Sequence, residues 1–154
     1  MKRIFIALSV ILAPLPALAA TPESYAGKQP RQLLKSAPDF ARAYREATRD
    51  LDLPAWTKRL AAGQSAQIVE IGGGKRILTS ACGKNGCLDE RIYILFDPEA
   101  KTATGIFFLP PAADEPGDTR TAFSRWFGKP AKEISDFLLE RAVGDAQSLN
   151  KPNH

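Results

Sequence analysis

The feature that most constrains the fold is a block of four short apolar segments joined by connections too short to hold a crossover helix. The segments are rich in β-branched and aromatic residues and span 67–71, 75–81, 91–96 and 104–109. A parallel crossover needs about a dozen or more residues, usually a helix, whereas antiparallel neighbours need only a tight turn. The block therefore predicts a meandering antiparallel sheet.

Helical periodicity flanks this block on both sides. Before it, apolar residues recur at helical spacing over about 37–50, with Ser36 as the predicted cap, and Pro54 opens a short second helix. After it, a weakly alternating segment at 119–127 predicts a fifth strand, and a helix begins at Pro130. The order predicts one α+β domain, an antiparallel meander sheet of about five strands flanked by N-terminal and C-terminal helices.

The first nineteen residues have the pattern of a cleavable secretory signal. Lys2 and Arg3 precede the apolar run 4–12, and Ala17-Leu18-Ala19 ends in a small-x-small cleavage site. The run is shorter than the roughly 20 residues that span a bilayer. We therefore expect signal peptide 1–19, a periplasmic mature chain, a flexible lead-in at 20–35, the domain at 36–145 and a flexible tail at 146–154.

The charge balance argues against a nucleic-acid partner. Of the 21 basic residues two leave with the signal, so 19 remain against 17 acidic ones, a net charge of +2. No block of lysine and arginine stands out along the chain, whereas nucleic-acid binding uses a clustered basic face. No stretch after the signal is long and apolar enough to predict a membrane span.

Both cysteines lie in the mature chain, at Cys82 and Cys87. An exported chain meets an oxidising compartment, where paired cysteines form disulfides. On the chain-entropy model a bridge that closes so short a loop stabilises the fold by only about 2 kcal/mol. The predicted disulfide therefore shapes a loop more than it holds the domain together.

The sequence offers no organised catalytic chemistry. The single histidine, His154, is the last residue, so nucleophile systems that need a positioned histidine base lack it. Two cysteines and one terminal histidine do not supply a zinc site either. Gly72-Gly73-Gly74-Lys75-Arg76 lacks the hydroxyl residue and the helix of a phosphate loop, and a hairpin turn is the better interpretation. We expect no enzyme activity, no metal and no cofactor.

Acidic and aromatic residues give weaker signals. Solvated loop charges explain the acids, which are Asp89, Glu90, Asp114, Glu115 and Asp118. Trp56 and Trp126 could stack on a ligand, but large aromatic side chains are more often core anchors.

The remaining candidate is the cysteine loop, whose inner residues are Gly83, Lys84, Asn85 and Gly86. The glycines permit a tight turn, which would put Lys84 and Asn85 at the tip. A constrained loop loses less entropy on binding, and exposed loops often carry function. A stapled hairpin without a partner explains the same residues equally well.

Several motifs in order resemble the inhibitors of vertebrate lysozyme, the Ivy family. They are Leu53-Pro54-Ala55-Trp56, Ser80-Ala81-Cys82 with Cys87, Arg91-Ile92, and Thr104-Gly105-Ile106-Phe107. The resemblance covers about 36–142. It implies an antiparallel sheet flanked by helices, often in a homodimer. It also implies a protruding disulfide loop that plugs the active-site cleft of a c-type lysozyme.

The loop departs from the family pattern. Well-known members carry Cys-Lys-Pro-His-Asp-Cys, whereas here Lys84, Asn85 and Gly86 stand where proline, histidine and aspartate would be. Lys84 could pair with the carboxylates of a lysozyme cleft while Asn85 donates a hydrogen bond. The leading hypothesis is inhibition of a c-type lysozyme. The alternatives are inhibition of an endogenous lytic transglycosylase and a non-inhibitory periplasmic binding or scaffold module.

Overall fold

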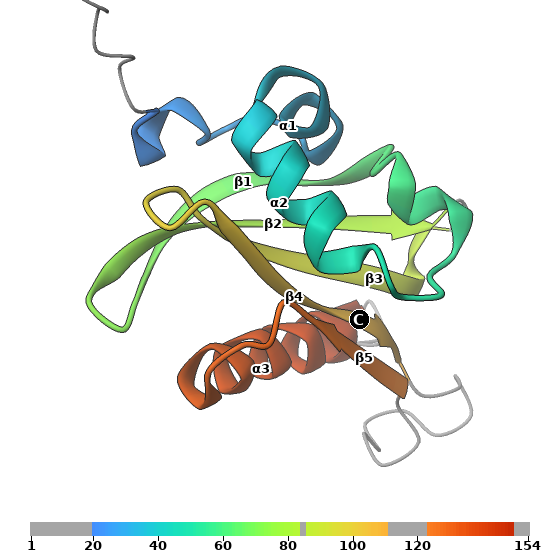
Figure 1. Ribbon diagram of the computed structural model, residues 1–154. Helices are drawn as coiled ribbons and strands as arrows, with labels where there is room; N and C mark the ends of the chain where they lie inside the picture. Colours follow the sequence, from blue (N-terminus) through green and yellow to red (C-terminus); the bar gives the residue numbers. More distant parts are fainter. Residues whose placement is uncertain (1–19, 84–85, 111–122, 150–154) are drawn as a thin grey trace, which may run out of the picture.

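A computed structural model describes residues 20–83, 86–110 and 123–149 (Figure 1). The predicted signal peptide and the last residues of the tail lie outside this part of the chain.

The sheet is the predicted antiparallel meander. Its strands follow one another in chain order, each paired antiparallel with the next, and are β1 (Ala62–Ile71), β2 (Gly74–Gly83), β3 (Gly86–Asp97), β4 (Thr102–Leu109) and β5 (Phe123–Phe127). The α+β class and the five strands are confirmed. Strand β1 begins before its predicted apolar segment, because its polar residues from Ala62 onward already pair with β2.

The turn between β1 and β2 shows how local sequence sets the register. Ile71 pairs with Gly74, so Gly72 and Gly73 alone form the loop, with φ angles of 60° and 73°. Two consecutive positive φ angles match the right-handed twist of a hairpin and favour glycine. The hairpin interpretation of this glycine run is confirmed.

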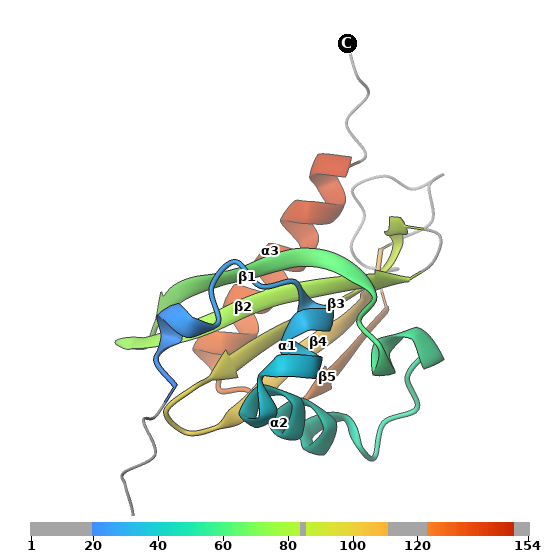
Figure 2. The same ribbon diagram turned by 90° about the horizontal axis from the view of Figure 1, so that it is seen from above.

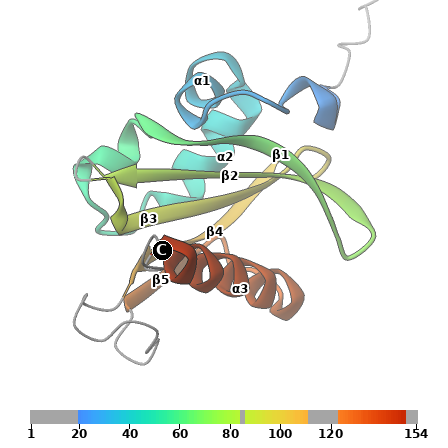
Figure 3. The ribbon, with the colours of Figure 1, turned by 180° about the vertical axis from the view of Figure 1, so that it is seen from behind.

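Helices cover both faces of the sheet (Figures 1 and 3). One face carries η1 (Pro22–Ser24), α1 (Pro30–Ser36), α2 (Pro38–Thr48) and η2 (Ala55–Lys58), while α3 (Lys132–Leu149) packs on the other. Successive side chains of β3 point to opposite faces of the sheet and so enter both cores. Ile92 and Ile94 face α1 and α2, and Tyr93 faces α3. None of the helices described is long and apolar enough to cross a membrane.

The chain before α2 differs from expectation. The lead-in at 20–35 was predicted to be loose, but it contains η1 and nearly all of α1 and buries Tyr25 and Leu33. The ring of Tyr25 lies 5.3 Å from that of Phe96. Ser36 is also not the cap of α2: it ends α1, and its hydroxyl donates to the carbonyl of Gln32. Pro30 is buried as well, and Leu34 packs against the same core, which composition alone does not reveal.

Adjacent leucines in α3 test how that helix docks. Leu138 is fully buried against the sheet, whereas its neighbour Leu139 is 42% exposed. Leu138→Ala should lower the free energy of unfolding by about 2–5 kcal/mol, while Leu139→Ala should change it by less than about 1 kcal/mol. Urea denaturation of both variants checks this, and equal losses would contradict the docking face.

Candidate functional site

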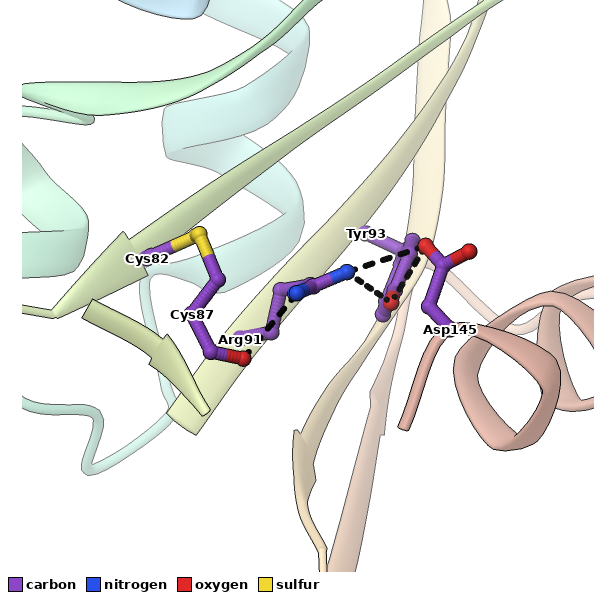
Figure 4. The surroundings of a disulfide bond; sticks show 5 residues. All are labelled: Cys82, Cys87, Arg91, Tyr93 and Asp145. Carbon is purple, nitrogen blue, oxygen red and sulfur yellow. Dashed lines mark hydrogen bonds and ion pairs between the residues drawn. A yellow bond between two sulfur atoms is a disulfide. The ribbon is translucent and has the colours of Figure 1, made fainter. Parts of the chain in front are cut away.

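The disulfide lies at one end of the β2–β3 hairpin (Figure 4). It joins Cys82 to Cys87, whose Cα atoms are 4.9 Å apart, and Gly83 pairs with Gly86 inside the closed ring. The predicted bridge and its position in a loop are confirmed. Lys84 and Asn85, the predicted tip residues, lie outside the described residues, so their side chains are not placed.

A buried arginine forms hydrogen bonds at the base of this loop. Arg91 lies on β3, is 6% exposed, and donates from Nη2 to the carbonyl oxygen of Cys87 over 3.0 Å. Its Nη1 donates to the Tyr93 hydroxyl over 3.0 Å and to Asp145 Oδ2 over 2.9 Å (Figure 4). A buried guanidinium is tolerated only when it is paired and hydrogen-bonded, and here both conditions are met.

Tyr93 completes the network. Its hydroxyl donates to Asp145 Oδ2 over 3.0 Å while accepting from Arg91. Burial raises the pKa of Tyr93, the Asp145 carboxylate adds to the increase, and Arg91 opposes it. The phenol therefore stays protonated at neutral pH and keeps its role as a donor.

This network connects the loop to a helix far along the chain. Asp145 belongs to α3 and lies 54 residues after Arg91. Sequence reasoning placed Asp145 at the last position of the domain, directly before the predicted flexible tail, and missed the contact. A partial signal existed, since Arg91 and Tyr93 are two apart and so share one face of a strand.

The opposite side of the loop base also holds a polar pair. Glu90 was predicted to be a solvated loop charge, but it lies on β3, half-buried, and accepts a hydrogen bond from Trp56 Nε1. A Cβ at Gly83 would meet the carboxylate end of the Glu90 side chain, so a larger residue at this position would have to displace that carboxylate from its place beside Trp56. The indole of Trp56 packs on Phe107, with ring centroids 6.3 Å apart.

The other candidates contribute less. Trp56 and Trp126 are both half-buried, and each packs against one of the two cores. Nothing is described for the side chain of Asp89, and Asp114, Glu115, Asp118 and His154 lie outside the described residues. Across 20–83, 86–110 and 123–149, no three histidine, cysteine, aspartate or glutamate side chains gather as metal ligands would.

Removing Asp145 tests the network. Asp145→Ala leaves the Arg91 charge unpaired, although the 20% exposure of the Asp145 side chain admits some water. We expect a loss of about 2–3 kcal/mol in the free energy of unfolding, somewhat below the range for fully buried pairs. Asp136→Ala is the control, because its pair with Lys132 is exposed and should matter by less than about 1 kcal/mol. Urea denaturation measures both variants, and equal losses in the free energy of unfolding would contradict a stabilising role for the Arg91–Asp145 pair.

Reducing the disulfide tests how much it contributes to the free energy of unfolding. Dithiothreitol should lower the free energy of unfolding by about 2 kcal/mol while the far-ultraviolet circular dichroism stays native. The variant Cys82→Ser with Cys87→Ser should have the reduced stability and no response to the reductant. Global unfolding on reduction would show that the bridge holds the whole domain.

Comparison with known proteins gives two relatives and no matching family model. The chain is 25% identical over 101 residues to the inhibitor of vertebrate lysozyme of Pseudomonas aeruginosa, covering 61% of this chain and 64% of that protein. It is 26% identical over 110 residues to an uncharacterized protein of the same bacterium, covering 66% of this chain and 71% of that one. The chain thus spans just under two thirds of the length of the first relative. Motif order, fold and comparison agree: this chain is similar to the inhibitors of vertebrate lysozyme.

Proposed function

We propose that this protein is an exported inhibitor of a c-type lysozyme and that its disulfide-closed loop enters the active-site cleft of the enzyme. The observation that carries the proposal is the similarity to a protein named as an inhibitor of vertebrate lysozyme. Export rests on the signal-like pattern of residues 1–19, and it supplies the oxidising compartment that the Cys82–Cys87 bridge requires.

Preorganisation of the loop base supports insertion. The disulfide closes the loop covalently, and Arg91 binds the carbonyl of Cys87 from the α3 side. A loop held at both points has less conformational entropy to lose on binding, so more of its contact energy appears as affinity.

The chemistry of the tip residues suits a glycosidase cleft. Such clefts hold a pair of catalytic carboxylic groups. Lys84 carries an ammonium group and Asn85 an amide, so both can donate hydrogen bonds to carboxylates. Gly83 and Gly86 add no side-chain bulk, which keeps the loop narrow enough for a cleft.

An inhibition assay tests the proposal. Excess mature protein should abolish most activity of a c-type lysozyme, and Lys84→Ala with Asn85→Ala should weaken inhibition by about tenfold or more, the equivalent of one lost charged contact. The control is Lys132→Ala with Gln147→Ala, which removes an ammonium and an amide from exposed positions of α3. This control variant should inhibit like the wild type.

Two results would overturn the assignment. One is absence of inhibition by the wild type, and the other is equal inhibition by the loop variant. A parallel assay with a lytic transglycosylase identifies the target class: inhibition of that enzyme alone would replace lysozyme with an endogenous partner. Lack of inhibition of both would leave a binding or scaffold module of the same fold. A homodimer is a separate proposal, tested by the mass of the mature protein in solution.

A further inference from the structure

A basic pocket lies beside the disulfide on the face of the sheet that carries α1 and α2. It has a volume of about 630 Å³ and is formed by α1, α2, η2 with the chain leading into β1, and the end of β2 at Cys82 and Gly83. Figure 2 shows η2 near the end of β2 where that strand meets the cysteine loop. Ligand sites for small molecules commonly have volumes of about 300–1,000 Å³.

Cations form the rim of the pocket. Five exposed basic side chains line it: Arg31, Lys35, Arg45, Lys58 and Arg59. Among the residues that the structure describes, none that lines the pocket is acidic, and none of these five cations takes part in an ion pair. Glu90 touches the pocket wall through its hydrogen bond with Trp56, and this single carboxylate does not balance five cations.

The sequence did not predict this concentration of charge. The expected mature chain has a net charge of only +2, with no basic block. The fold brings together single cations from α1, α2 and the segment around η2, which are separate in sequence. Charges gathered around a concave site raise the local potential and the concentration of anions there.

The floor of the pocket is apolar. Leu34 and Trp56 line it, both half-buried, together with the buried Cys82. Because Trp56 Nε1 is already bonded to Glu90, the indole offers a ligand its ring surface rather than its donor. Packing on Phe107 and the bond to Glu90 together fix the plane of that ring.

We propose that this pocket binds a small ligand that carries at least two oxyanion groups, carboxylates or phosphates, and an apolar or ring-shaped part that packs on Trp56. Guanidinium groups bind both kinds of oxyanion in a bidentate manner, and three of the five rim cations are arginines. The proposal is independent of lysozyme inhibition, since it uses none of the tip residues.

Fluorescence of Trp56 reports on binding directly. The chain has two tryptophans, so Trp126→Phe leaves Trp56 as the only one. This variant is titrated with fructose 1,6-bisphosphate and with cyclohexane-1,2-dicarboxylate, each of which carries two oxyanion groups on a ring, and with their neutral counterparts fructose and cyclohexane-1,2-dicarboxamide. At least one anion should give a saturable change with a dissociation constant below about 1 mM, weakened by 0.5 M salt, and the neutral compounds should give none. Calorimetry on the wild type repeats the measurement without the substitution.

A charge-matched pair of variants locates the site. Arg31→Gln, Lys35→Gln and Arg59→Gln together should weaken binding by about tenfold or more. Arg42→Gln, Arg49→Gln and Lys75→Gln remove the same charge outside the pocket and should leave the affinity within about twofold. Three results would overturn the proposal. The fluorescence change could fail to saturate with either anion, the neutral compounds could bind as tightly as the anions, or the two variants could lose the same affinity. Whichever anion binds identifies the phosphate or the carboxylate class.

Discussion

The buried guanidinium of Arg91 is the contact on which the organisation of the loop end depends. It binds the carbonyl of Cys87, the hydroxyl of Tyr93 and the carboxylate of Asp145 at once. A buried charge cannot remain without partners, so β3, the disulfide loop and α3 are required to meet at this point. The disulfide alone constrains only the short ring that it closes, whereas the hydrogen bonds of Arg91 connect that ring to helix α3.

The sheet and the loop were predictable because their signals are local. Short connections identify the antiparallel meander, two glycines with positive φ define the first turn, and two nearby cysteines close a loop. Long-range features were not predictable. The burial of Tyr25 on the sheet, the bond between Glu90 and Trp56, and the pairing of Arg91 with Asp145 each join residues distant in sequence. No periodicity or motif encodes such pairings.

Two candidate sites meet at the same end of the molecule. Cys82 belongs to the disulfide loop and also lines the basic pocket. Polar bonds hold the loop base from both sides, with Arg91 reaching toward α3 and Glu90 toward Trp56. A partner that engages the loop would therefore lie close to a positive surface, which favours partners with acidic groups near the point of contact.

The most direct test of this account is an NMR titration of the mature protein with a c-type lysozyme. If the loop is the contact element, the largest amide shift changes and line broadening should fall on residues 82–91 and then on the pocket residues around Trp56. Changes centred on the β1–β2 turn at Gly72 and Gly73, or the absence of changes at excess enzyme, would contradict the account.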